Sequence, residues 1–136
     1  MARSVSLRDD LRSVESDAPF DQVVDRLRTL IGERGLTLFA DIDHAQNARD
    51  AGLEMPNARV LIFGSAKSGT PLMLAAPEIA LELPLRILVR ERSDGRTDLV
   101  YIDPSRLAED FGVGELTPAI AGLAAIAHAA AGVAPP

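Results

Sequence analysis

The sequence predicts an α+β domain of two layers, in which helices pack on one face of a four-stranded, largely antiparallel sheet. Three observations support this prediction. Apolar residues recur at helical spacing after Pro19, several short apolar runs have the length of strands, and the Asp94-Gly95 pair is a strong signal for a hairpin between the last two strands. The predicted elements follow in the order α-β-α-β-α-β-β-α-α.

The first predicted helix begins near Pro19 and ends at Gly35. Proline suits the first helical turn, Asp17 is the predicted cap, and glycine is typical of the residue that follows a helix. The helix has one apolar stripe, formed by Phe20, Val23, Val24, Leu27, Leu30 and Ile31. Residues 36–42, LTLFADI, follow as the first predicted strand.

A second, short helix is predicted directly after this strand. Asp43 and Gln46 have the spacing of a capping box, in which the Asp43 side chain accepts from the Gln46 backbone amide and the Gln46 side chain reaches back. Gly52 ends the helix. Strand 59–64, RVLIFG, comes next. Because its apolar run is nearly continuous, we expect a central strand that is covered on at least one face.

The segment GSAKSGTPLM, residues 64–73, connects this strand to a third helix. Thr70-Pro71 predicts where the helix starts, because threonine caps helices and proline is tolerated in the first turn. Pro77 then either kinks the helix or begins a new turn.

The C-terminal half supplies the hairpin and another helix. Strands 85–91 and 98–103 flank the turn RSDGRT. Asp103-Pro104 repeats the pattern of a cap followed by proline, and Gly112 ends the helix that starts there.

A last, Ala-rich helix is predicted from about Thr117 to Ala130. With 136 residues, the chain has the length of one domain. We expect residues 1–17 to form a flexible N-terminal arm, residues 18–113 to form a single α+β domain, and residues 114–136 to form the Ala-rich helix and a tail.

Composition excludes several classes of function. Fourteen Lys and Arg stand against 20 Asp and Glu, and the net charge of −6 argues against a nucleic-acid binder. The chain has no cysteine, which excludes disulfides, thiolate metal sites and cysteine nucleophiles. Two separated histidines without patterned carboxylates predict no metal site, and no motif predicts a cofactor.

The two ends of the chain predict no membrane partner. The N-terminus, MARSVSLRDDLRSVESD, lacks the apolar stretch of a signal peptide. The C-terminal run AIAGLAAIAHAAAGVA is shorter than the roughly 20 strongly apolar residues that cross a bilayer. We therefore expect a cytoplasmic protein.

Three segments together resemble a known family. They are LFADIDHAQNARDAGLEM, LIFGSAKSGTPLMLAAPEIALELPLRILV and DLVYIDPSRLAEDFGV. Over about residues 20–113 they resemble the bacterial and archaeal domain-of-unknown-function 302 family. The resemblance implies a compact α+β domain, commonly a homodimer, with no established biochemical activity. This chain has Ser65-Ala66 where the family pattern has Asn-Pro.

The glycines of GSAKSGT have the separation found in phosphate-binding loops of nucleotide hydrolases. Thr70-Pro71, however, stands where that loop requires Lys and Ser or Thr, so we do not expect nucleotide hydrolysis. We favour a structural turn that Thr70 caps, and the alternative is a cradle for a small anion. The candidate cradle residues are Gly64, Lys67, Ser68, Gly69 and Thr70.

His44 is a second candidate for a site. Asp43 and Asn47 beside it could orient the imidazole, which makes His44 a candidate general acid or base. We favour a histidine that packs or hydrogen-bonds locally, because no nucleophile or second base is evident nearby. Tyr101, near the end of the last strand, is a further candidate for ligand binding at an opening of the sheet.

The leading functional hypothesis is a homodimeric module that binds a small ligand or another protein, without demonstrated catalysis. The alternative is an enzyme acting on a small anionic substrate, with His44 as general acid/base and Gly64–Thr70 as the anion cradle. That alternative requires His44 and the cradle to border one pocket. A third hypothesis is that the Ala-rich helix packs against a partner subunit.

Overall fold

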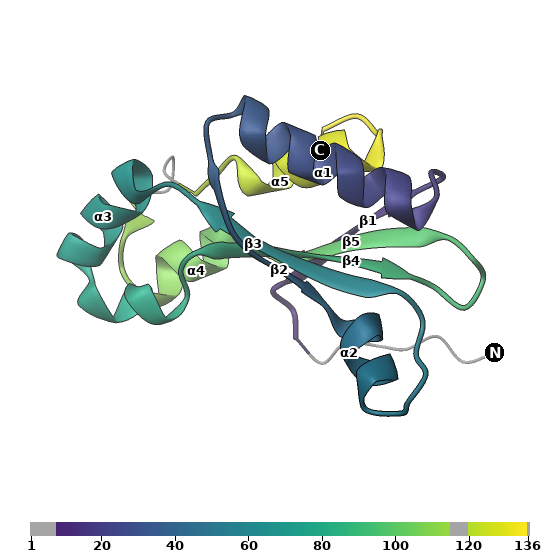
Figure 1. Cartoon of the computed structure of the whole chain (residues 1–136). Coiled ribbons are helices and arrows are strands. Elements are labelled where there is room, and N and C mark those ends of the chain that lie inside the picture. Colours follow the sequence, from purple (N-terminus) through teal and green to yellow (C-terminus); the bar gives the residue numbers. More distant parts are fainter. Residues whose placement is uncertain (1–7, 115–119, 136) are drawn as a thin grey trace.

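Five antiparallel strands form one sheet in the computed structural model, which describes residues 8–114 and 120–135 (Figure 1). Their order across the sheet is β1-β5-β4-β3-β2, so the edge strands are β1 and β2. The strands are β1 (Leu11–Ser16), β2 (Thr37–Asp43), β3 (Ala58–Gly64), β4 (Leu85–Glu91) and β5 (Thr97–Ile102).

The prediction of four strands was wrong, because β1 lies within the expected N-terminal arm. Strand β1 pairs with β5, with Val14 opposite Leu99, and the element order therefore begins with a strand. The sequence LRSVES contains two apolar residues, of which only Val14 is buried, so its hydrophobic pattern is too weak to indicate a strand. The backbone ladder with β5, rather than apolar content, gives this edge strand its place.

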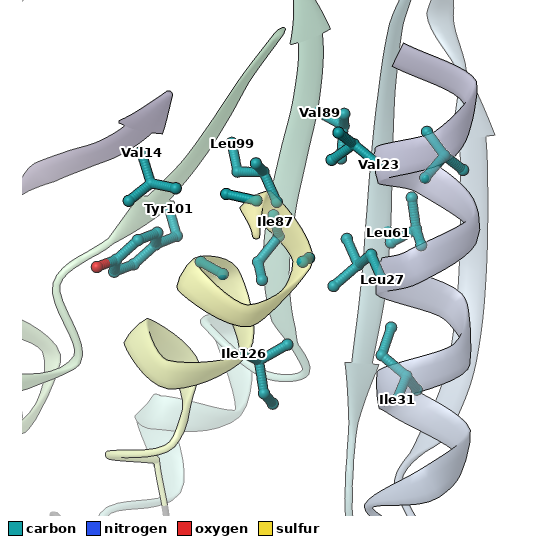
Figure 2. Close-up of a cluster of buried hydrophobic side chains, with 14 of the residues drawn as sticks. Val14, Val23, Leu27, Ile31, Leu61, Ile87, Val89, Leu99, Tyr101 and Ile126 are labelled. Carbon is teal, nitrogen blue, oxygen red and sulfur yellow. The ribbon is translucent and has the colours of Figure 1, made fainter. Parts of the chain in front are cut away.

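Two helices cover one face of the sheet, which we call the inner face. Helix α1 (Phe20–Glu33) packs against β2, β4 and α5 (Leu123–Ala131), and α5 also contacts β1 and β5 (Figure 1). The predicted stripe of α1 is buried except for Leu30, which is half-buried and packs against the same cluster. The side chains of Val23, Leu27 and Leu61 meet between α1 and the sheet (Figure 2).

Alanines bring α5 close to its neighbours. Ala127 and Ala130 are fully buried within this single chain, so the helix buries its small face here against α1 and the sheet rather than reserving it for a partner. Ser16, also buried, donates its hydroxyl to the Ala131 carbonyl at 2.7 Å and accepts from the Ala18 amide at 3.2 Å. One side chain thus joins β1, the start of α1 and the end of α5. The predicted start of the last helix at Thr117 lies outside the described residues.

Helix α2 (His44–Asp50) lies on the opposite side of the sheet from α1 (Figure 1). Its predicted cap is present, because the Asp43 carboxylate accepts from the Gln46 amide at 2.9 Å. The Gln46 side chain donates to Asp50 instead of reaching back, so the capping box is half formed.

Helix α3 (Ala66–Ala75) begins earlier than the sequence predicts. Ser65 is its cap and accepts weakly from the Ser68 amide at 3.4 Å, while Pro71 lies inside the helix. The signal Thr70-Pro71 was misleading because Ser65 provides an equivalent cap one turn upstream. The 3-10 helix η1 (Pro77–Leu81) follows, so Pro77 begins a new turn.

A second apolar cluster closes one end of the sheet. Helix α4 (Pro104–Asp110) is capped as predicted, with the Asp103 carboxylate accepting from the Ser105 amide at 3.0 Å. The cluster joins α3, η1 and α4 and consists of Leu72, Ile79, Leu107, Ala108, Val113 and Ile120. Half-buried Leu85 on β4 contacts both this cluster and the main core.

Replacing Leu27 by Ala should lower the free energy of unfolding by about 2–5 kcal/mol, because the fully buried side chain leaves a cavity between α1 and the sheet. Urea denaturation measures this change. The matched control is Leu81→Ala on η1, where the side chain is 86% exposed and the change should stay within about 0.5 kcal/mol. Equal effects of the two substitutions would contradict the assignment of the core.

Candidate functional site

A pocket of about 390 Å³ opens on the inner face, between the end of the sheet, α3 and the start of α5. Most of its wall is aliphatic or aromatic. Residues from all surrounding elements contribute: Leu36, Phe39, Phe63, Leu72, Met73, Leu83, Leu85, Ile120, Leu123 and Ile126, together with smaller and polar residues named below.

The pocket exists because the helices above the sheet do not reach this end of it. Phe63 on β3 and Leu85 on β4 face inward there, beyond the C-terminal end of α1. Leu123 and Ile126 on the first turn of α5 form one wall, and Leu72 on α3 contributes to another. The pocket therefore lies where the main core and the second cluster meet.

A β-bulge adds an aromatic side chain to the pocket. Leu38 pairs with Phe63 and Ala40 with Ile62, which leaves Phe39 as an extra residue in β2. Phe39 is 55% exposed and lines the pocket. The sequence LTLFADI alone does not predict the bulge, because it is also compatible with a regular strand whose side chains alternate between the two faces.

The polar side chains at the pocket are few. Ser65 and Ser68 line it at the start of α3, and Arg34 lines it directly after the end of α1. Arg34 is exposed and forms no ion pair with the described residues. It is the only charged side chain among the described residues that line the pocket.

Only part of the predicted anion cradle lines the pocket. Gly64, Ser68 and Gly69 line the pocket, whereas Lys67 and Thr70 are exposed and do not. The amides of Ser68 and Gly69 both donate to the Ser65 carbonyl, at 3.2 and 2.7 Å. These groups are therefore occupied by the first turn of α3, since the segment is helical rather than a loop.

The structure does not bring His44 to this pocket. His44 follows Asp43, which pairs with Arg59, while Gly64 pairs with Thr37 at the opposite end of β2. Gly64 is five positions from Arg59 along β3, a distance of roughly 17 Å at the usual rise of a strand. His44 and Asn47 are exposed on α2, and the pocket lining includes neither.

Asp41, three residues before His44, pairs with two arginines. Its carboxylate accepts from Arg59 at 2.9 and 3.1 Å and also pairs with Arg28 of α1. Burial alone would raise the pKa of Asp41, but the hydrogen bonds from Arg59 and Arg28 outweigh it and hold that pKa below its ordinary value. The group joins α1 to strands β2 and β3 and is structural.

Tyr101 lies in the main core rather than at an opening of the sheet. Its ring packs near Val14 beneath α5, and it is 7% exposed (Figure 2). Burial, followed by the nearby Asp103 charge, raises the pKa of its phenol. The alternation of Tyr101 with its strand neighbours is thus the ordinary pattern of an inward-facing core residue.

The described part of the chain offers neither a cluster of metal ligands nor a membrane-spanning helix. No group of three or more His, Cys, Asp or Glu stands close enough to hold a metal ion in residues 8–114 and 120–135. Within the same ranges, none of the helices has the length and apolar character needed to cross a membrane.

Comparison with known proteins connects the chain to one family. A family model described as "Domain of unknown function DUF302" matches residues 12–131, a range that includes most of β1 and all of α5. A crystal structure of an uncharacterized conserved DUF302 protein from Bacillus stearothermophilus has a TM-score of 0.76 to this fold, covering 92% of this chain and 98% of that chain. At 13% sequence identity, this similarity shows the fold alone.

Longer proteins contain a similar segment. Two proteins named "Fluoride-specific ion channel FluC 1", from Brucella suis biovar 1 (strain 1330) and Brucella abortus biovar 1 (strain 9-941), are each 34% identical to this chain over 104 residues. The match covers 76% of this chain but 41% and 38% of those proteins. The chain therefore spans about two fifths of the length of the curated relatives it matches.

Asp41→Asn should lower the free energy of unfolding at neutral pH. It should also make that free energy depend less on pH in the acid range. Because the folded state lowers the pKa of Asp41, its contribution is complete above the ordinary value of 3.8 and is lost as the pH falls through the folded value. Urea denaturation between neutral and strongly acid pH measures this dependence. The control is Asp50→Asn, since Asp50 is exposed and forms no ion pair with the described residues. An acid dependence as steep in Asp41→Asn as in the wild type would contradict the role of the Arg28–Asp41–Arg59 group.

Proposed function

The chain belongs to the DUF302 family, and we propose that it is a binding domain for a small, mainly apolar ligand held in the pocket between α3 and α5. The observation that supports this proposal is the pocket itself. Its volume of about 390 Å³ falls in the range of known small-ligand sites, and its wall combines a broad apolar surface with a few polar groups.

The composition of the pocket wall favours binding over catalysis. The described lining residues include no histidine, aspartate or glutamate, and the hydroxyl of Ser65 already accepts from a backbone amide. General acid–base chemistry requires a titratable side chain, such as that of histidine, aspartate or glutamate, within hydrogen-bond reach of the substrate. The alternative of an enzyme that combines His44 with the Gly64–Thr70 segment gains no support, since these elements lie at opposite ends of β3.

We also propose that the protein acts as a homodimer through the outer face of the sheet. Ile42, Val60, Leu88 and Val100 pair in one row across four strands on the face opposite the main core. All four are half-buried, and a second copy of the chain would remove this apolar row from water. The family resemblance, which implies homodimers, also supports this proposal.

Light scattering at micromolar concentration should give about twice the monomer mass of 14.5 kDa. Leu88→Lys should return the mass to that of the monomer, because it places a charge within the apolar row. Leu81→Lys, on exposed η1, is the matched control and should leave the dimer intact. A monomeric wild type would overturn this part of the proposal.

Ala66→Trp should weaken binding of octanol, a neutral apolar probe, by about tenfold or more, because the indole would occupy the pocket. Ala66 lines the pocket yet is exposed on the first turn of α3, so the substitution should cost little stability. Isothermal titration calorimetry measures the affinity, and the melting temperature reports the fold.

The matched control for this test is Ala75→Trp, which places the same side chain at the exposed far end of α3, outside the pocket. It should bind octanol as the wild type does. Absence of binding by the wild type, or an equal loss in both variants, would overturn the ligand proposal.

A further inference from the structure

Arg34 is a charged residue at an otherwise uncharged pocket lining. Many arginines of the chain pair with carboxylates, for example Arg12 with Asp103, Arg90 with Asp98, and Arg106 with Asp9, whereas Arg26, Arg34 and Arg49 form no ion pair with the described residues. Arg34 has no such partner among the described residues, although the chain as a whole is acidic. Arg34 lines a mainly apolar wall that has no acidic residue among the described lining residues.

The dipole of helix α1 explains only in part why an arginine lies at position 34. A cation is favoured at the C-terminal end of a helix, and Arg34 occupies the position directly after α1. The dipole would favour Lys or Arg at several positions in the last turn, but the last turn of α1 itself has no basic residue. Arg34 is the residue from that end that also lines the pocket.

The size and lining of the pocket restrict the ligand further. The volume of about 390 Å³ lies near the lower end of the range of small-ligand sites, which fits a ligand of medium length. A single guanidinium matches one carboxylate, to which it donates two parallel hydrogen bonds. With no acidic side chain in the described lining, the site offers nothing to balance a cationic group on the ligand.

We infer that the ligand is a medium-chain amphipathic monocarboxylate, with its carboxylate at Arg34 and its hydrocarbon chain against Phe63, Leu72 and Ile126. This inference rests on the proposed function, because it names the ligand class of the same pocket. The apolar chain supplies the affinity and Arg34 supplies the preference for an anion. The net charge of −6 acts against anions in general, so a preference for an anion requires a local cation.

The test compares octanoate with octanol, which have chains of the same length and differ in charge. Isothermal titration calorimetry on the whole protein should show octanoate binding about three- to tenfold more tightly than octanol at low salt. Arg34→Gln should remove this difference, because it should lower the affinity for octanoate by about three- to tenfold and the affinity for octanol by less. A protein melting curve in the absence of ligand verifies that the variant is folded.

Arg49→Gln is the matched control, because Arg49 is also an exposed arginine at the C-terminal end of a helix but lies outside the pocket lining. It should keep the preference for octanoate. Equal affinities of the wild type for octanoate and octanol, or a preference that survives in Arg34→Gln, would overturn this inference while the pocket itself remains a binding site. Failure of both compounds to bind would overturn the proposed function and this inference together.

Discussion

The whole structure depends on covering the inner face of the sheet. Val14, Leu61, Ile87 and Leu99 come from four different strands and all face the same way. Helix α1 spans one side of this face and α5 the other, and neither is wide enough to cover it alone. Burial of apolar area is the dominant favourable term in folding, so each helix is needed to exclude water from its half of the sheet.

This division of the sheet explains the pocket. Helix α1 ends at Glu33, and α5 begins at Leu123 on the same side of the sheet. The space beyond them is closed by α3 and by the second apolar cluster, which meet the main core at Leu85. Packing in the two clusters is therefore continuous around a hollow that is itself apolar. Arg34, the residue directly after α1, is brought to this hollow as a consequence.

Much of the fold could be predicted from the sequence because its signals are local. The stripe of α1, the Asp43 and Asp103 caps, and the Asp94-Gly95 hairpin each depend on residues within a few positions of one another. These elements were predicted with the correct type, and most bounds were within a few residues. Family membership was predicted from the same motifs and is confirmed by the match to residues 12–131.

The remaining features depend on contacts between distant residues. Strand β1 has one buried apolar residue and is fixed by its ladder to β5, so its sequence resembles that of an arm. Helix α3 starts after the cap Ser65 and not at Thr70, although both residues give an equally good local signal for a helix start. The pocket joins residues from 34 to 126, and the separation of His44 from Gly64 follows from the register of β2 on β3. No local pattern contains that information.

The most direct test of this account is nuclear magnetic resonance of methyl-labelled protein with bound octanoate. Nuclear Overhauser effects should connect the ligand chain to the methyl groups of Leu72 and Ile126, which line the pocket on the covered face. Val60 and Val100, in the row on the outer face, should show none. Contacts to the outer-face methyls with none to Leu72 or Ile126 would contradict the claim that the two covering helices leave a ligand site where they end.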